Sequence, residues 1–276
     1  MDKYGMSKIK VGNIHLKYTN SSTTQSGFGA QHCHDGFEIL YVVEGHGKYV
    51  IEGAEYQIKP RTILFAPPFS YHTLLLEPET QYERYVLQFF ASDLTSSAQE
   101  FLSSLNKSLE GVGCYYAADA LSPSIISIFD RFDAVDSLPE KEGKEFKKLL
   151  ASEMVLLLSV AARESIPRDE GELGARVIKY LNEHLDKDMS LDKLAKRFFV
   201  SKYYLCRAFK KHNGISVHGY INQKRVMYAK QLIESGETAS AAAYKVGFGD
   251  YSAFYRAYIK HVGHAPTSHF PRGNVE

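Results

Sequence analysis

The sequence SKYYLCRAFKKHNG at residues 201–214 is repeated 49 residues later, at residues 250–263, as DYSAFYRAYIKHVG. Leu205 and Phe209 of the first copy correspond to Phe254 and Tyr258 of the second, so the apolar positions are similar in kind. A repeat of this length indicates two copies of one supersecondary unit. Five positions are identical in both copies: Arg207/Arg256, Ala208/Ala257, Lys211/Lys260, His212/His261 and Gly214/Gly263.

Each copy follows a shorter predicted helix, at residues 191–198 and 238–246, and a tight connection. Ser201 and Asp250 open the two copies, and their side-chain oxygens can accept hydrogen bonds from the free amides of a first helical turn. A helix, a short turn and a capped second helix form the helix-turn-helix pattern, which the sequence therefore predicts twice.

The second helix of each predicted unit has two distinct faces. Leu205 and Phe209, like Phe254 and Tyr258, lie on a stripe that would pack on the preceding helix. The opposite face carries long donors and aromatic rings, as a helix that reads base edges in the major groove requires. Solvated hairpins of a helical bundle are the alternative, which exposed aromatic rings fit poorly. The predicted DNA-binding residues are Lys202, Tyr203, Cys206, Arg207, Lys210, Tyr251, Ser252, Tyr255 and Arg256.

The charge of the 276-residue chain is unevenly distributed, although the formal net charge is only +1. Residues 1–170 have a net charge of −7, whereas residues 171–276 have +8. This asymmetry favours an acidic module joined to a basic one that meets DNA phosphates. The composition, with 44% hydrophobic and 24% charged residues, is that of a globular protein and excludes a mainly disordered chain.

The sequence shows no signal for export or for insertion in a membrane. The longest nearly apolar run, residues 154–162, is too short to cross a bilayer, and the first residues contain no apolar signal-peptide core. The three cysteines are too few and too scattered for a disulfide framework. We therefore expect a cytoplasmic protein without a membrane partner.

The N-terminal half predicts an α+β multidomain chain. Between residues 8 and 90, short β-branched and aromatic segments alternate with Gly and Pro turns, which indicates a β-barrel or sandwich. After Asp93 the pattern becomes helical, and a helix at residues 145–163 is apolar nearly all round, so we expect it to be buried. It would pack under the barrel or form a subunit interface. The predicted domains are an effector-sensing barrel (1–92), a helical dimerisation appendage (93–164), a linker (165–174) and an all-helical domain with two helix-turn-helix units (175–276).

Ordered motifs along the chain resemble the AraC/XylS family of bacterial transcription regulators. The matching motifs are Leu191-x-x-Leu194-Ala195, Ser201-x-x-Tyr204-Leu205-x-Arg207-x-Phe209-Lys210, Tyr220-x4-Arg225-x3-Ala229 and Val246-Gly247-Phe248-x-Asp250-x-Ser252-x-Phe254-x-Arg256. The resemblance implies a regulator that binds promoter DNA and contacts RNA polymerase. It also implies a homodimer and a small-molecule effector, for which a sugar is the default expectation. By position it implies that Tyr203, Cys206 and Arg207, with Tyr251, Ser252 and Arg256, read bases.

The second unit departs from the family pattern. Ala239 and Ala242 stand where the family usually has two large aliphatic side chains, so this unit has fewer methylenes to bury. We therefore expect the first unit to be the stronger reader of sequence.

Four residues of the N-terminal half form a cupin-like pattern. His32, His34 and Glu38 match the first cupin motif and His72 the lone histidine of the second, so this half resembles a cupin barrel. Three imidazoles and a carboxylate suit Fe, Mn, Ni or Zn, and a metal-dependent cupin enzyme with an accessory helical domain is the alternative function. Pocket lining without metal and satisfied interior polar groups are the other interpretations. We predict effector binding by these four residues, with no metal, no cofactor and no catalytic residue, in a protein that is not an enzyme.

Overall fold

The computed structural model describes residues 14–22, 32–79, 81–109, 113–135, 137–161, 163 and 173–266. The chain forms two compact units, Met1–Arg168 and Asp169–Glu276. The division falls inside the segment predicted as a linker, of which residues 165–172 lie outside the described residues. The predicted linker ends too late, because α4 (Leu173–Glu183) already begins inside it.

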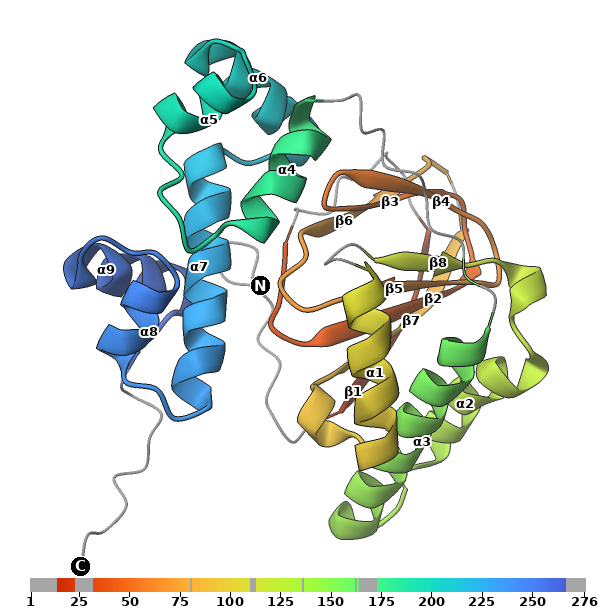
Figure 1. Ribbon diagram of the computed structural model, residues 1–276. Coiled ribbons are helices and arrows are strands. Elements are labelled where there is room, and N and C mark those ends of the chain that lie inside the picture. Colours follow the sequence, from red (N-terminus) through yellow and green to blue (C-terminus); the bar gives the residue numbers. More distant parts are fainter. Residues whose placement is uncertain are drawn as a thin grey trace, which may run out of the picture. The chain divides into compact units, whose positions relative to one another are not determined.

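The N-terminal unit contains two antiparallel sheets (Figure 1). One sheet has the strand order β1-β7-β2-β5-β8 and the other β4-β3-β6. The seven strands up to residue 89 lie within the segment predicted to consist of short strands and turns, residues 8–90. The strands are β1 (His15–Ser22), β2 (Phe37–Glu44), β3 (Gly47–Ile51), β4 (Ala54–Ile58), β5 (Thr62–Ala66), β6 (His72–Leu76), β7 (Gln81–Phe89) and β8 (Cys114–Tyr116).

Strand β2 has two buried faces because successive side chains point to opposite sides of a sheet. Ile39 and Tyr41 belong to the core formed with the helices, whereas Leu40 and Val42 belong to the core formed with the second sheet. The helices α1 (Ser96–Leu109), α2 (Pro123–Val135) and α3 (Glu140–Val160) lie together on one side of the larger sheet (Figure 1). Side chains that share a face with Leu40, Glu38 among them, therefore lie between the two sheets.

Strand β8 was not predicted. It pairs with β5, with Cys114 opposite Phe65 and Tyr116 opposite Ile63, so the sheet continues beyond the expected barrel boundary at residue 92. The prediction that the chain is helical after Asp93 is wrong here. Three residues are too few to show a period of two, and the strand is held by its long-range partner rather than by its own pattern.

Helix α3 is buried on one side only, so the prediction of complete burial is wrong. Leu150, Met154 and Leu158 pack in the core beneath the larger sheet, as one of the two expected arrangements requires. Leu149 and Val160, however, are 55% and 79% exposed. The excess of apolar residues on this helix therefore lies on the surface.

The C-terminal unit is entirely helical over its described residues, as predicted. After α4 it contains α5 (Leu191–Arg197), α6 (Lys202–Asn213), α7 (Val217–Glu234), α8 (Ala239–Lys245) and α9 (Tyr251–Val262). Within the parts of the chain that the structure describes, no helix combines the length and apolar character needed to cross a membrane.

Both predicted N-caps are formed. Ser201 Oγ accepts a hydrogen bond from the Tyr204 amide at 3.2 Å, and Asp250 Oδ1 accepts one from the Ala253 amide at 2.7 Å. Leu205 and Phe254 are completely buried. The repeat therefore produces two helix-turn-helix units, α5–α6 and α8–α9, joined by the 18-residue helix α7.

Candidate functional site

The second helices, α6 and α9, expose the faces predicted to read DNA. On α6 Tyr203 is 75% exposed, Lys202, Arg207 and Lys210 are also exposed, and Cys206 is half-buried. The opposite side of α6 is closed by Leu205 and Phe209. On α9 the predicted residues Tyr251, Ser252, Tyr255 and Arg256 are all exposed.

The surroundings of the two exposed faces differ. Lys202 Nζ lies 2.9 Å from Asp192 Oδ1 of α5, so one cation of the first face is held toward its own unit. Arg256 lines a cavity of about 520 Å³ together with Arg225 and Asn222 of α7 and Lys260 of α9. This cavity gathers cationic and hydrogen-bonding side chains beside the second recognition helix, a chemistry that suits a phosphate. Sequence analysis missed Arg225 and Lys260 as functional candidates, because the fold and not their spacing brings them beside Arg256.

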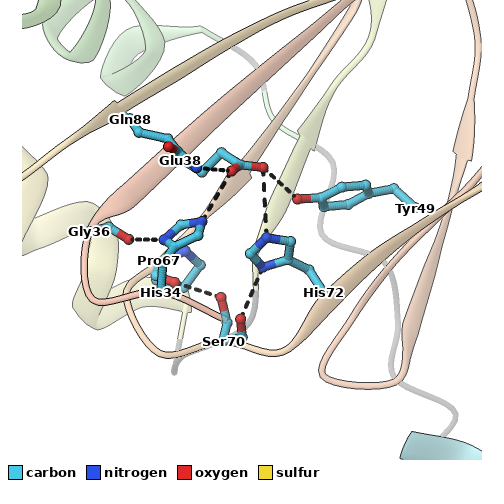
Figure 2. A network of polar contacts seen from close by, with 8 residues as sticks. All are labelled: His34, Gly36, Glu38, Tyr49, Pro67, Ser70, His72 and Gln88. Carbon is cyan, nitrogen blue, oxygen red and sulfur yellow. Dashed lines mark hydrogen bonds and ion pairs between the residues drawn. The ribbon is translucent and has the colours of Figure 1, made fainter. Parts of the chain in front are cut away.

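A second candidate site lies inside the N-terminal unit, where Glu38 is the centre of a buried polar network (Figure 2). Glu38 Oε2 lies 3.1 Å from His34 Nε2, while His34 Nδ1 lies 2.9 Å from the carbonyl oxygen of Gly36. His34 and Glu38, two of the four residues predicted to bind the effector, therefore lie in direct contact. His34 precedes β2, and a bend at Asp35 and Gly36 turns it toward Glu38.

The histidines His32 and His72 are brought together by their backbones. Each donates its amide to the carbonyl of the other, at 3.1 and 2.9 Å, as an isolated antiparallel bridge. Directly opposed residues place their side chains on one face, and the two ring centroids are 4.4 Å apart. His72 Nδ1 lies 3.0 Å from the Ser70 carbonyl oxygen, and His72 Nε2 lies 3.8 Å from Glu38 Oε1 (Figure 2). All four predicted residues therefore lie in one cluster.

Two further residues of the network were missed by sequence analysis. Tyr49 of β3 donates its hydroxyl to Glu38 Oε1 at 3.0 Å, and Gln88 of β7 donates its amide to Glu38 Oε2 at 2.7 Å. Gln88 stands directly opposite Glu38 in the β2–β7 register, and Tyr49 reaches across from the smaller sheet. Strand pairing could have found Gln88, but no local pattern marks Tyr49.

Burial and charge set the protonation states in this cluster. Burial lowers the pKa of His72 to about 3, although the neighbouring Glu38 opposes that effect. Burial alone would raise the pKa of Glu38, but the electrostatic influence of His72 and the hydrogen bonds from His34 and Gln88 hold it well below its usual value. Near neutral pH, Glu38 is therefore a carboxylate and His72 a neutral imidazole.

The cysteines take no part in this network. Cys33 lies between His32 and His34 in sequence and is 1% exposed, as expected for a small apolar side chain. Cys114 is also buried, and burial raises the pKa of its thiol to about 11. Burial therefore makes the Cys114 thiol a poor nucleophile near neutral pH and keeps the Cys33 thiol away from solvent.

A pair of exposed recognition helices and a buried polar cluster in a separate β-sheet unit define the class of ligand-responsive DNA-binding regulators. Family models agree with both halves. Residues 14–157 match the AraC-like ligand binding domain, and residues 194–271 match a helix-turn-helix domain. The chain belongs to the AraC family of transcription regulators, as its motifs predicted.

Curated relatives match most of the chain, and the chain is also similar to some solved structures. The HTH-type transcriptional activator RhaS of Enterobacter sp. (strain 638) is 25% identical over an alignment of 246 residues, which covers 86% of this chain and 85% of the relative. RhaS of Salmonella agona (strain SL483) is 26% identical over 249 residues, with the same two coverages. ToxT from Vibrio cholerae O395 is 14% identical with a TM-score of 0.37, and the match covers 91% of this chain and 95% of ToxT. The DNA-binding domain of AdpA, solved with a target DNA, is 24% identical with a TM-score of 0.33, over 34% of this chain and 86% of its own.

Proposed function

We propose that the protein is a homodimeric transcription activator that binds promoter DNA through α6 and α9 and responds to a small molecule bound in the N-terminal unit. The repeated capped helix carries this proposal, because both copies leave one face of long donors and aromatic rings open to solvent. The nine exposed or half-exposed residues predicted on these faces are the proposed DNA contacts. A chain with this task acts in the cytoplasm, contacts RNA polymerase and is not an enzyme.

Helix α7 supports simultaneous contact of both units with one duplex. Its 18 residues span about 27 Å at the ordinary rise of an α-helix. Successive major-groove segments on one face of B-DNA are about 34 Å apart, so a rod of this length can hold two readers in neighbouring segments. One chain would therefore read a site of two groove segments, and a dimer would read two such sites.

The exposed stripe on α3 supports dimerisation through the N-terminal unit. Phe146, Leu149, Leu156 and Val160 recur at the spacing of a coiled-coil seam, and Phe146 and Leu149 are each about half exposed. Exposed apolar side chains at that spacing are typical of a helix that pairs with a partner helix. Leu149→Glu should therefore give monomers in sedimentation at micromolar concentration, while Lys144→Ala, at an exposed position away from this stripe, should remain dimeric. A dimeric Leu149→Glu would contradict this interface.

The buried cluster of His32, His34, Glu38 and His72 is the proposed effector site. Its imidazole and carboxylate groups can exchange hydrogen bonds with the hydroxyls of a sugar or a related metabolite. Calorimetry against a panel of sugars and organic acids identifies the ligand class. His34→Ala and Glu38→Ala should lose both the heat of binding and the effector-dependent change in DNA affinity. If both variants respond as the wild type does, the effector binds elsewhere.

DNA binding itself is tested by gel-shift titration at fixed salt on fragments with one or two binding sites, selected from genomic DNA. The full chain should bind the two-site fragment at least about two orders of magnitude more tightly than residues 171–276 alone, because a dimer gains avidity. The two proteins should differ little on a single site. Equal affinities on the two-site fragment would overturn the dimer, and no sequence preference at all would overturn the proposed function.

A further inference from the structure

We propose that Thr19, Tyr82 and Arg84 recognise the anionic group of a small-molecule effector between the two sheets of the N-terminal unit. This inference rests on the proposed effector response and names the ligand class, a carboxylate or phosphate ester that also carries hydroxyl groups. Arg84 stands opposite Thr19 in the β1–β7 register and opposite Val42 in the β2–β7 register. Directly opposed side chains share one face, and Val42 belongs to the core between the sheets, so Thr19 and Arg84 face that core.

The three side chains carry buried polar atoms that have no hydrogen-bond partner among the described residues. These atoms are Thr19 Oγ1, the Tyr82 hydroxyl oxygen and Arg84 Nε. All three groups can donate a hydrogen bond, and a guanidinium can only donate. Buried polar atoms in folded proteins almost always have a partner, so three donors side by side indicate an acceptor that comes from outside the chain.

Arg84 also brings a charge that no carboxylate of the described residues neutralises. It is half-buried, it forms no ion pair in this part of the chain, and its guanidinium carbon lies 5.3 Å from the centre of the Tyr82 ring. A partly buried charge without a counterion destabilises a fold unless a ligand compensates it. A water molecule would satisfy the hydrogen bonds of this group but not its charge, whereas a carboxylate or phosphate satisfies both.

Tyr82 is held in a fixed position beside this guanidinium. It is 2% exposed, and its ring lies against Gly45, where an added Cβ would lie 2.5 Å from the ring carbon Cδ2. Burial raises the pKa of Tyr82 to about 12, although the charge of Arg84 opposes that effect. The hydroxyl is therefore a neutral donor near neutral pH.

The proposed effector cluster around Glu38 lies at the other end of the same face. Gln88, which stands opposite Glu38, and Arg84 are four residues apart on β7, or about 13 Å along the strand. Burial and the Glu38 carboxylate raise the pKa of the Tyr49 hydroxyl and the charge of Arg84 lowers it, so Tyr49 lies within electrostatic reach of both ends. The Glu38 carboxylate repels an anion, so the hydroxyls of the ligand face Glu38 and its anionic group faces Arg84. Sugar acids and sugar phosphates carry both kinds of group.

The experiment uses the full-length protein without effector or DNA. Inorganic phosphate and acetate are the probes, and each is compared with chloride at equal ionic strength. Hydrogen–deuterium exchange is followed over β1 and β7, because the basic C-terminal unit also attracts anions. At about ten times its Kd, the anion that the subsite takes should slow exchange in the wild type by about tenfold. The probe that protects identifies the anionic group, and Arg84→Met should remove the protection.

Arg131→Met is the matched control, because it removes the same charge from an exposed ion pair with Glu153 in the same unit. It should be protected as the wild type is. Without added anion, Arg84→Met should melt no lower than the wild type, since its guanidinium has no partner to lose. A lower melting temperature would make Arg84 a structural group and overturn the proposal. Wild-type protein without anion-specific protection, or equal protection in Arg84→Met through an adventitious ion only, would overturn it as well.

The effector class is tested with the ligand that the calorimetric panel identifies. This ligand should be anionic, and its affinity should fall by at least about tenfold in Arg84→Met. A neutral sugar that binds wild type and Arg84→Met equally would overturn the ligand class while leaving the proposed regulator standing. Protection by inorganic anions without any effector response would contradict the proposed function alone.

Discussion

The two helix-turn-helix turns have the same backbone path and opposite surroundings. Phe199, with φ of 56°, and Gly247, with φ of 92°, both adopt the left-handed conformation directly after their first helix. In each turn the following amide returns to the first helix, from Val200 to the Ala195 carbonyl and from Phe248 to the Ala243 carbonyl, at 3.0 Å in both cases. Phe199 is 94% exposed, whereas a Cβ on Gly247 would lie within 2.9 Å of the carbonyl oxygens of Leu185 and Asp186.

This comparison separates two reasons why a turn can require glycine: the strain of the left-handed backbone and the lack of space for a Cβ atom. A left-handed residue costs roughly 1–2 kcal/mol for any side chain other than glycine, and the first unit tolerates that cost at Phe199 because nothing crowds the ring. The second unit has no room for a side chain at Gly247, because the loop between α4 and α5 lies against it. Arg225 holds that loop in place by donating from Nε to the Leu185 carbonyl at 2.8 Å. The second turn also contains one more residue, Gly249, before the N-cap.

The largest predicted effect is at Gly247. Gly247→Ala should destabilise the C-terminal unit by about 2–4 kcal/mol, because the left-handed conformation is strained and the new Cβ meets two backbone oxygens that cannot move independently. Hydrogen–deuterium exchange of the full chain, followed over residues 239–263, measures the loss. Gly236→Ala is the control, because Gly236 also has a positive φ of 103° but has nothing within 4 Å of a Cβ. It should cost about 1 kcal/mol, and an equal loss at both sites would refute the steric account.

The next effect concerns the two arginines at equivalent repeat positions. Arg207→Ala should weaken binding to the selected DNA site by about 1–3 kcal/mol and relax the preference at one base position, because a bidentate guanidinium reads guanine. Arg256→Ala should cost less, since Arg225 and Lys260 line the same cavity and retain positive charge beside the duplex. Gel-shift titration of DNA sites that carry each of the four bases at each position measures both losses of affinity and the change in base preference. A loss at Arg207 that is equal for every sequence and shrinks with added salt would make it a phosphate contact instead.

The two N-caps sharpen the comparison further. Asp250→Ala should destabilise the second unit by about 1–2 kcal/mol and Ser201→Ala the first by about 0.5–1 kcal/mol. The charged cap makes the shorter hydrogen bond and also complements the positive end of the helix dipole. Hydrogen exchange at α6 and α9 during urea unfolding of the full chain measures both losses of stability. Asp250→Asn keeps the hydrogen bond without the charge, so its stability should lie between those of the wild type and Asp250→Ala. A loss equal to that of Asp250→Ala would assign the whole effect to charge.

Most of the fold followed from local patterns. The repeat, its caps and its apolar stripes predicted the helices α5, α6, α8 and α9, and turns with β-branched segments predicted the strand-rich segment that contains the first seven strands. Strand β8 escaped because its three residues are held by pairing with β5, which lies far earlier in the chain. Burial of α3 was overestimated because amphipathicity gives which residues are apolar but not which apolar face finds a partner within the chain.

The candidate sites were predicted to the same extent. Exposure of the recognition faces followed from helical periodicity, and the cluster of His32, His34, Glu38 and His72 was implied by the resemblance to the two cupin motifs. The contribution of Tyr49 and the cavity lined by Arg225 and Arg256 did not, because both depend on how separate elements pack. The local sequence pattern predicted the same tight connection in both copies of the repeat. Packing nevertheless leaves no space for a side chain at Gly247 and leaves Phe199 exposed.

The smallest predicted effect is at Phe199 and has the opposite sign to that at Gly247. Phe199→Gly should stabilise the C-terminal unit by about 0.5–1 kcal/mol, because relief of left-handed strain outweighs the entropy that glycine adds to the unfolded chain. Few packing contacts are lost, since the ring is almost entirely exposed. Exchange over residues 191–213 measures the gain, and Phe199→Ala is the control, because alanine removes the ring but keeps the strain. DNA affinity of both variants is titrated in parallel. A loss of stability in Phe199→Gly would show that the ring packs in solution, and the comparison of the two turns would then rest on Gly247 alone.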